Sequence, residues 1–368
     1  MSGWDEVALV DLGRFSSGKP IVPGSEGQFK AFGSNGVIGG SPVARHDRGI
    51  IVGRVGAYCG SVAVSHDPFW ASDNTIVIEP VVDEDLDYLY YLLRSANLNR
   101  HAGGAAQPLV TQGTLKALLF PVPGPASRRQ IGRLLRNFDD LIEKNRRRVA
   151  VLEEIARAIY REWFVKFRYP GHEDVPLIDS TLGPIPVGWR AGTVGEVLEL
   201  KYGKALKADA RRGGDVTVVS SAGVVGWHDE SLVDGPAIVV GRKGNVGSVH
   251  WVDGHCWPID TAYYVATNLP LRFVAEQLRR IEFTNTHAAV PGLSRESAYA
   301  RPFLAPPEDL LDSYQALVDP LGAEASALTR QSDRLVSLRD LLLPKLVTGR
   351  IDVSALDLDE LVEERVAS

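Results

Sequence analysis

The chain contains one pattern of residues twice, at a spacing of about 185 residues. Residues 34–39 match residues 221–226, and residues 51–56 match residues 239–244 at almost the same offset. The remaining matches are residues 60–62 with 247–249, Trp4 with Trp189, Trp70 with Trp257, Asp73 with Asp260, Pro108 with Pro291, Phe120 with Phe303, and Pro123 with Pro306. A long internal period of this kind fixes the architecture before any other feature does. It predicts two copies of one structural unit.

Each copy begins with short apolar runs that are separated by glycines. Residues 49–55, 74–82 and 237–241 are rich in Gly, Val and Ile, which is typical of strands joined by turns. Residues 86–96 and 271–283 have the character of short helices. The front of each copy is therefore predicted to be a mixed α/β domain.

A long helix is predicted at the back of the first copy, over residues 127–168. It follows the proline-rich segment 121–125 and ends before Pro170-Gly171. Apolar residues within it recur at alternating spacings of four and three, which is the seam of a coiled coil. The seam residues are Phe138, Ile142, Asn145, Val149, Leu152, Ala156, Ile159 and Trp163. Asn145 either sets the register against a partner helix or faces solvent.

The second copy has a similar helix over residues 307 to about 346, with a less regular seam. Pro320 and Gly322 are expected to kink or restart this helix. A helix of about 40 residues is roughly 60 Å long, too long for the core of one small domain. The two helices are therefore expected to form an antiparallel pair with a globular domain toward each end.

These patterns predict an α+β fold with an internal repeat, in which two similar mixed α/β domains are separated by two long helices that form an antiparallel coiled coil. The expected parts are a first globular domain (1–126), a long helix (127–169), a linker and second globular domain (170–306), a second long helix (307–350) and an acidic tail (351–368).

The net charge of −6 argues at first against a nucleic-acid partner. However, residues 351–368 carry six acids against Arg365, a local charge of −5, which leaves −1 for the rest of the chain. Charge therefore permits DNA binding without demonstrating it. Cys59 and Cys256 have no metal-ligand spacing and are interpreted as buried apolar side chains. With no long apolar run and no signal peptide, a cytoplasmic protein without membrane contact is expected.

Two similar domains at a fixed separation would recognise two short half-sites with an unread spacer between them. Since the copies differ between their shared motifs, the half-sites are expected to differ as well. This predicts an asymmetric, bipartite DNA target.

Three segments resemble the conserved regions of type I restriction-modification specificity subunits. Residues 129–142, 145–147 and 152–165 are similar to the central conserved region, and residues 183–189 to the lead-in to the second target-recognition domain. Residues 338–351 resemble the distal conserved region. Together these segments identify the chain as a member of that family, over nearly its whole length.

The resemblance implies a non-catalytic subunit that binds double-stranded DNA, two methyltransferase subunits and a motor-nuclease (restriction) subunit. S-adenosylmethionine, ATP and Mg²⁺ would then be bound by the partners, and no cofactor or metal by this chain. In agreement, the sequence has no amino-methyltransferase motif and no phosphate-binding loop. The side chains expected at the subunit interface are Asn145, Trp163, Phe164, Leu342 and Leu346. For Trp163 and Phe164, packing between helices is the alternative.

The candidate DNA contacts lie in pairs of matching segments. Arg54 and Arg242, the latter followed by Lys243, stand in glycine-bounded turns after strands, where a guanidinium reaches phosphate or guanine. A structural turn with a solvated arginine is the alternative. The other candidates are Lys19 and Lys204 in Gly-Lys steps, and the polar loop residues Ser34, Asn35, Ser220 and Ser221, which are also ordinary turn formers.

Two rival hypotheses belong to other classes. The first is a structural or decoy scaffold that no longer reads DNA, which the acidic net charge favours slightly. The second is a stand-alone enzyme such as a nuclease, which the missing motifs argue against.

Overall fold

The computed structural model describes residues 4–103, 108–283 and 292–353. They form two compact units. Unit 1 comprises residues 1–145 and 331–368, and unit 2 comprises residues 146–330. The boundary between the units falls within both long helices, α4 (Pro125–Tyr160) and α8 (Glu308–Val347), so each unit contains part of each helix.

Unit 1 contains three groups of strands. A four-stranded antiparallel sheet has the order β2-β8-β5-β6, a three-stranded sheet has the order β4-β3-β7, and β1 pairs with β9. The strands are β1 (Trp4–Ala8), β2 (Gly13–Ser17), β3 (Phe29–Gly33), β4 (Gly36–Ser41), β5 (Gly49–Gly53), β6 (Val62–Ser65), β7 (Phe69–Ala71), β8 (Thr75–Pro80) and β9 (Leu119–Pro123). The short helices are α1 (Leu9–Leu12), α2 (Leu86–Ser95) and α3 (Gln112–Lys116).

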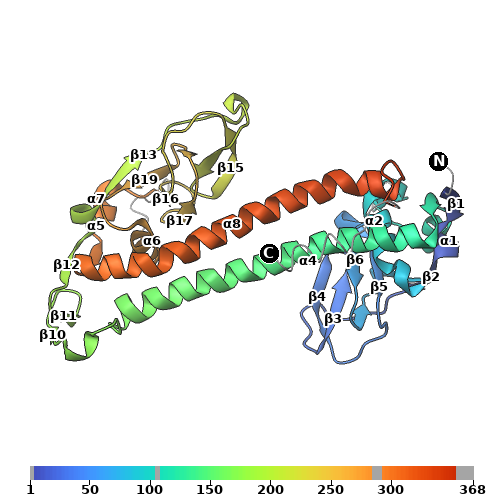
Figure 1. Ribbon diagram of the computed structural model, residues 1–368, viewed down its shortest axis with the longest axis horizontal. Helices are drawn as coiled ribbons and strands as arrows, with labels where there is room; N and C mark the ends of the chain where they lie inside the picture. The colour runs from blue at the N-terminus through green and yellow to red at the C-terminus, as the bar shows by residue number, and fades with distance from the viewer. Residues whose placement is uncertain (1–3, 104–107, 284–291, 354–368) are drawn as a thin grey trace. The chain divides into compact units, whose positions relative to one another are not determined.

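Unit 2 repeats this topology strand for strand, with the orders β13-β19-β16-β17, β15-β14-β18 and β12-β20 (Figure 1). Its strands are β12 (Arg190–Thr193), β13 (Glu199–Tyr202), β14 (Val216–Ser220), β15 (Gly223–His228), β16 (Ala237–Gly241), β17 (Val249–Val252), β18 (Cys256–Pro258), β19 (Ala262–Ala266) and β20 (Pro302–Ala305). Its short helices are α5 (Val194–Val197), α6 (Leu271–Arg279) and α7 (Arg295–Tyr299). A small hairpin, β10 (Leu177–Ile178) with β11 (Ile185–Pro186), precedes them.

The repeat extends to irregular details of the sheets. The β3/β4 ladder shifts register between Ala31 and Phe32, and the β14/β15 ladder shifts between Val218 and Val219. In both three-stranded sheets the last strand pairs in parallel with the central one. The prediction of two mixed α/β copies is therefore confirmed.

The long helices differ from their expected bounds. Helix α4 ends at Tyr160, earlier than expected, and continues as a π-helical turn over Arg161–Val165. Helix α8 runs without interruption through Pro320, so the expected restart is wrong. Val318 and Leu328 are buried on either side of the proline, and this packing offsets the single lost backbone hydrogen bond.

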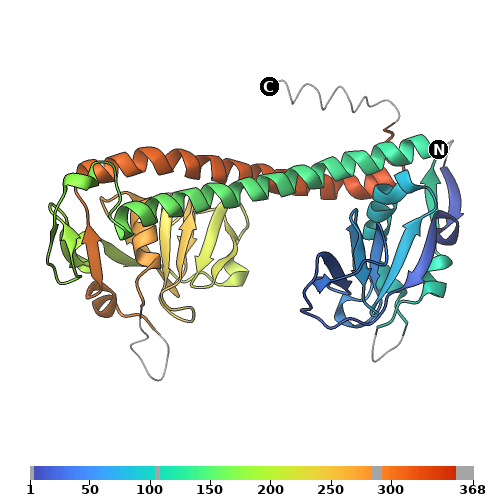
Figure 2. The same cartoon turned by 90° about the horizontal axis from the view of Figure 1, so that it is seen from below.

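The long helices pair antiparallel inside each unit. In unit 1 the Asn145 amide donates to Gln331 Oε1 over 2.8 Å, and Asp139 meets Arg339 farther along both helices. In unit 2, Arg148 pairs with Glu324, and Tyr160 contacts Tyr314. Figure 2 shows the strands of each unit on one side of its own helix pair. The predicted antiparallel pairing is confirmed.

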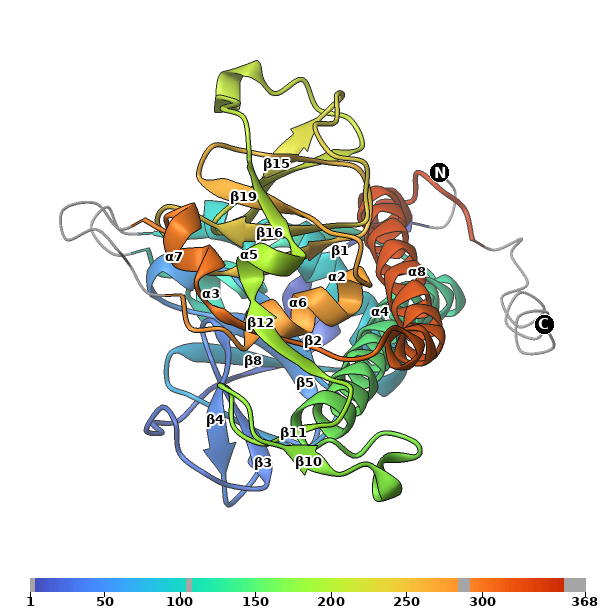
Figure 3. The ribbon, with the colours of Figure 1, turned by 90° about the vertical axis from the view of Figure 1, so that its left-hand side faces the viewer.

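The short helix after the last sheet strand docks onto the long helix of the same unit. In unit 1, Asp87 of α2 pairs with Arg136 Nη1 of α4 at 3.4 Å and with His66 Nε2 at 2.7 Å. In unit 2, Arg272 Nε of α6 pairs with Asp319 Oδ1 of α8 at 3.3 Å. Figure 3 shows α6 beside α8. These are matching positions, at offsets of 185 and 183. The two docking pairs occupy the same position with opposite polarity, because the short helix carries the acid in unit 1 and the base in unit 2.

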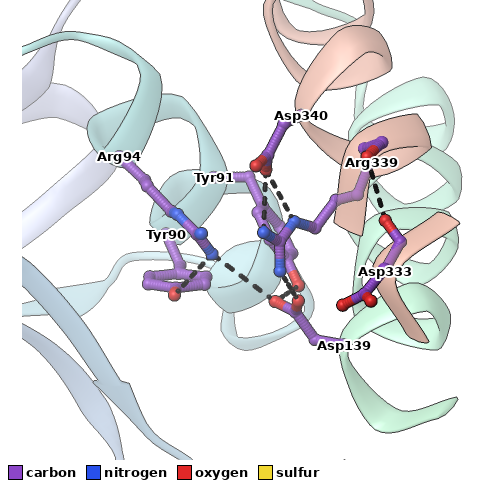
Figure 4. A network of polar contacts seen from close by, with 8 residues as sticks. Tyr90, Tyr91, Arg94, Asp139, Asp333, Arg339 and Asp340 are labelled. Atoms are coloured by element: carbon purple, nitrogen blue, oxygen red, sulfur yellow. Dashed lines mark hydrogen bonds and ion pairs between the residues drawn. The ribbon is translucent and has the colours of Figure 1, made fainter. Parts of the chain in front are cut away.

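A polar network lies beside the docking pair of unit 1. The Tyr91 hydroxyl donates to Asp139 over 2.6 Å, and Arg339 bridges Asp139 and Asp340 (Figure 4). Arg94 Nη1 approaches Asp139 at 3.7 Å. Burial, together with the hydrogen bond to Asp139, raises the pKa of the Tyr91 phenol, so this group remains a donor.

Unit 2 has a cavity of about 330 Å³ at the matching place. Gly322 stands there in place of Asp139, Ala156 in place of Arg339, and Glu276 in place of Tyr91, and all three line the cavity. Gly322 also leaves room for Arg272, because a Cβ at this position would lie 1.9 Å from the Arg272 Cζ. The Arg272 guanidinium in this space also lies over the Trp251 ring, 4.5 Å from the ring centroid.

Both cysteines are buried and free, as predicted. Burial raises the pKa of the Cys256 thiol to about 11 and that of Cys59 above its ordinary value. The two thiols are therefore poor nucleophiles and serve as packing groups.

Candidate nucleic-acid interface

Three segments that are distant in the sequence meet on one surface of unit 1. They are the end of β2, the glycine turn after β5, and the segment that leads into α3. The Arg54 carbonyl accepts from the Val110 amide over 2.9 Å. The Gln112 Nε2 donates to Ser17 Oγ over 3.0 Å. These contacts join the backbone of the Arg54 turn and the side chain of Gln112 to the same part of unit 1.

Unit 2 builds the same surface from the matching segments. The Arg242 carbonyl accepts from the Leu293 amide over 2.8 Å. Arg295, the first residue of α7, lies over the Tyr202 ring at 4.1 Å, and Arg242 lies over the same ring at 4.8 Å. Tyr202, at the end of β13, is 48% exposed, so two guanidinium groups surround an aromatic ring at the surface.

Glycine is required where each arginine turn begins. A Cβ on Gly53 would lie 2.5 Å from Ser61 Oγ and from the Tyr58 carbonyl oxygen. A Cβ on Gly241 would lie 2.0 Å from the Asn245 carbonyl oxygen. The close approach of the following loop thus explains the repeated Gly-Arg step and holds each arginine backbone in place.

The paired lysines are exposed, and their backbones are fixed. The Trp70 indole donates to the Lys19 carbonyl over 3.1 Å, and the Trp257 indole donates to the Lys204 carbonyl over 3.0 Å. Lys243 is also exposed. Within the described residues, no carboxylate forms an ion pair with the candidate basic residues Lys19, Arg54, Lys204, Arg242 and Lys243. Their positive charge is available to an anionic partner.

The polar loop residues divide into two groups. Asn35 is exposed at the β3/β4 turn, and Ser34 is half-buried with its hydroxyl donating to the Asn74 carbonyl over 2.8 Å. Ser220 and Ser221 are buried, with exposures of 7% and 6%. The Ser220 hydroxyl donates to the Gly223 carbonyl over 3.2 Å. The interpretation of these two serines as base-reading loop tips is therefore corrected, because the Ser220 side chain closes the turn and the Ser221 side chain is buried.

The residues expected at the subunit interface are internal. Asn145, Trp163, Phe164 and Leu346 are all less than 9% exposed. Leu342 is partly buried against the core of unit 1. Trp163 and Phe164 pack on Tyr314, which favours the alternative of helix packing. Their placement at an exposed interface is corrected, since a partner would have to contact the outer faces of the helices.

Sequence reasoning missed four residues of this surface, namely Ser17 and Gln112 in unit 1 and Tyr202 and Arg295 in unit 2. Their signal lies in the repeat, because Gln112 and Arg295 are separated by the same 183 residues as Phe120 and Phe303. Only the strand pairing shows that they meet the ends of β2 and β13.

Comparison with known proteins agrees with this architecture. Residues 1–154 match the model of the type I restriction modification DNA specificity domain. This segment of the chain is therefore similar to that domain family. The resemblance to type I specificity subunits that the sequence indicated is confirmed.

The similar proteins are named as type I specificity subunits. The chain is 26% identical over 336 residues to the type I restriction enzyme MjaIX specificity subunit of Methanocaldococcus jannaschii, covering 81% of this chain and 76% of that one. It is 30% identical to the Escherichia coli type I restriction enzyme EcoprrI specificity subunit over 139 residues, which cover 37% of this chain and 35% of that subunit.

A solved structure shares the fold. The S subunit of a type I restriction-modification system from M. genitalium superimposes with a TM-score of 0.72 at 17% identity, covering 94% of this chain and 96% of that one. In the described part of the chain, no helix is long and apolar enough to span a membrane, and no group of three or more His, Cys, Asp or Glu residues could hold a metal ion.

Proposed function

We propose that this chain is the DNA-recognition subunit of a type I restriction-modification complex. Its two globular domains each read one half of an asymmetric, bipartite site in double-stranded DNA. The observation that carries this proposal is the repeated surface, in which a glycine-bounded arginine and a Gly-Lys step recur in both units without carboxylate partners among the described residues.

The repeated surface has the chemistry that DNA recognition needs. Lys19 and Lys204 are exposed cations on fixed backbones, suited to phosphate contact, which positions a protein on the duplex. Arg54 and Arg242 stand in the glycine turns of the same two units, where the planar guanidinium can contact phosphate or fork onto guanine. The overall charge of −6 does not conflict with this, since the acidic excess is concentrated in residues 351–368.

The proposal assigns the chemistry to partner subunits. Two methyltransferase subunits would bind the outer faces of the long helices, and a restriction subunit would join the assembly. S-adenosylmethionine, ATP and Mg²⁺ would be bound by those partners, while this chain is the non-catalytic component.

The decisive experiment is co-expression with the genomically adjacent methyltransferase in a host without DNA methylation, followed by sequencing of modified adenines. An asymmetric bipartite motif that is methylated only when both proteins are present supports the proposal. A stable purified complex that adds no methylation contradicts it and favours the decoy scaffold.

A salt titration separates the same two hypotheses by binding. A complex that neutralises phosphates loses affinity steadily as salt increases, because counterions are released on binding. Binding to its own target with no salt dependence would exclude the role given to the lysines and arginines.

A further inference from the structure

Gln112 and Arg295 occupy the same position in the two units. Each is the first residue of a five-residue helix, and the hydroxyl just before it caps that helix. Thr111 Oγ1 accepts from the Thr114 amide over 3.1 Å, and Ser294 Oγ accepts from the Ser297 amide over the same distance. The matched caps fix the two backbones in equivalent geometry.

The side chains also rest on equivalent neighbours. Gln112 donates to Ser17, which is paired with Ile76 of β8, and Arg295 lies over Tyr202, which is paired with Tyr263 of β19. Ser17 and Tyr202 are the last residues of matching strands. At this one site, unit 1 has a hydrogen-bonded pair, Gln112 with Ser17, and unit 2 has an arginine over an aromatic ring, Arg295 on Tyr202.

Both side chains keep recognition groups that no described residue engages. Ser17 takes one N–H of the Gln112 amide, which leaves its second N–H and its carbonyl oxygen. The Arg295 guanidinium lies over the Tyr202 ring, and its Nε is buried without a hydrogen-bond partner among the described residues. Contact with the ring restricts the guanidinium, and its two Nη groups are the donors that stay available to an acceptor pair.

The two positions adjoin the arginine turns of the repeated surface. The segment before Gln112 is hydrogen-bonded to Arg54, and the segment before Arg295 is hydrogen-bonded to Arg242. Arg242 and Arg295 share the Tyr202 ring. A duplex held by the flanking cations would therefore present base edges to these two side chains.

We propose that Gln112 and Arg295 are specificity-determining residues that make the two half-sites different. In a DNA major groove, glutamine forms two hydrogen bonds with adenine through N6 and N7, and arginine forms two with guanine through O6 and N7. Unit 1 therefore reads an A·T pair at this position, and unit 2 reads a G·C pair. This inference rests on the proposed function, which supplies the DNA.

The test exchanges the two side chains in the full chain, co-expressed with its methyltransferase. Gln112→Arg should change one position of the unit 1 half-site from A·T to G·C, and Arg295→Gln should make the reverse change in the unit 2 half-site. Preference for the new base should reach roughly 10- to 100-fold, the discrimination that one two-bond contact provides. In each variant the untouched half-site is the matched control within the same molecule.

A second variant covers the case in which an exchange lowers all methylation. Ser17→Ala keeps Gln112 and removes only its anchor, so it should relax the preference at that same position several-fold without changing the rest of the motif. Binding of the purified complex to duplexes that differ at one base pair measures this directly.

The outcomes are distinguishable from failure of the proposed function. If the wild-type complex methylates nothing, the function itself is wrong. If the wild-type complex methylates a bipartite motif, and that motif and its base preferences are the same in all three variants, this inference is overturned.

Discussion

The two units have one topology and different chemistry where the globular part meets the long helices. Unit 1 fills this junction with the network of Tyr91, Asp139 and Arg339. Unit 2 has a cavity of about 330 Å³ there, lined by Gly322 and Ala156. The sheets and the helix pairing therefore define the fold, while the side chains at this junction can change completely.

The largest effect is expected when the network of unit 1 is broken. Arg339→Ala leaves Asp139 beside a buried space without its main cation, and removal of one partner from a mostly buried pair is costly. Since Asp139 is 29% exposed, the loss in unfolding free energy should be about 2 kcal/mol, below the range for fully buried pairs.

Urea unfolding measures this loss, and Arg330→Ala on the exposed face of α8 is the matched control, with an expected change within about 0.5 kcal/mol. Equal losses for the two variants would show that the network does not stabilise unit 1.

A second prediction compares the repeated arginines. Arg54→Ala and Arg242→Ala should each weaken recognition of one half-site by about tenfold, as expected for one lost charged contact. Assembly with the methyltransferase should be unchanged in both variants, and loss of assembly would contradict the assigned role. Arg242→Ala should also destabilise unit 2 slightly, because Arg242 stacks on Tyr202 and donates to the Asp260 carbonyl over 3.1 Å.

The smallest effect concerns the docking pairs of opposite polarity. Asp87→Arg places a like charge beside Arg136 and should cost about 1 kcal/mol of unfolding free energy, because the pair is partly exposed. Adding Arg136→Asp should restore most of that loss. A double-mutant cycle on Arg272 and Asp319 should give a coupling energy of similar size. Zero coupling energy in both units would show that these pairs do not stabilise the docking of the short helices.

Sequence patterns predicted the features that depend on period and spacing. The duplicated motifs predicted two mixed α/β copies. The four-three spacing in residues 138–163 predicted a coiled-coil seam, and a second seamed helix in the other copy predicted the antiparallel pair. The bounds of the helices were less accurate, because tertiary packing carries α8 through Pro320 and ends α4 at Tyr160.

The candidate site was predictable only in part. Glycine-bounded arginines and exposed lysines are visible as local motifs. The burial of Ser220 and Ser221 depends on the loop that folds over them, and the contact of Gln112 with Ser17 joins residues 95 positions apart. Such contacts follow from strand pairing, which local spacing does not encode.

The reversed polarity of the docking pairs distinguishes the two globular parts from each other. A chain with two nearly superimposable halves risks joining the wrong half to a helix, either within one molecule or between two molecules during synthesis. An exchanged docking would set Asp87 against Asp319 and Arg272 against Arg136, so both errors meet like charges. The opposite charges of the two docking pairs therefore favour the native pairing of each short helix with its own long helix over the exchanged pairing.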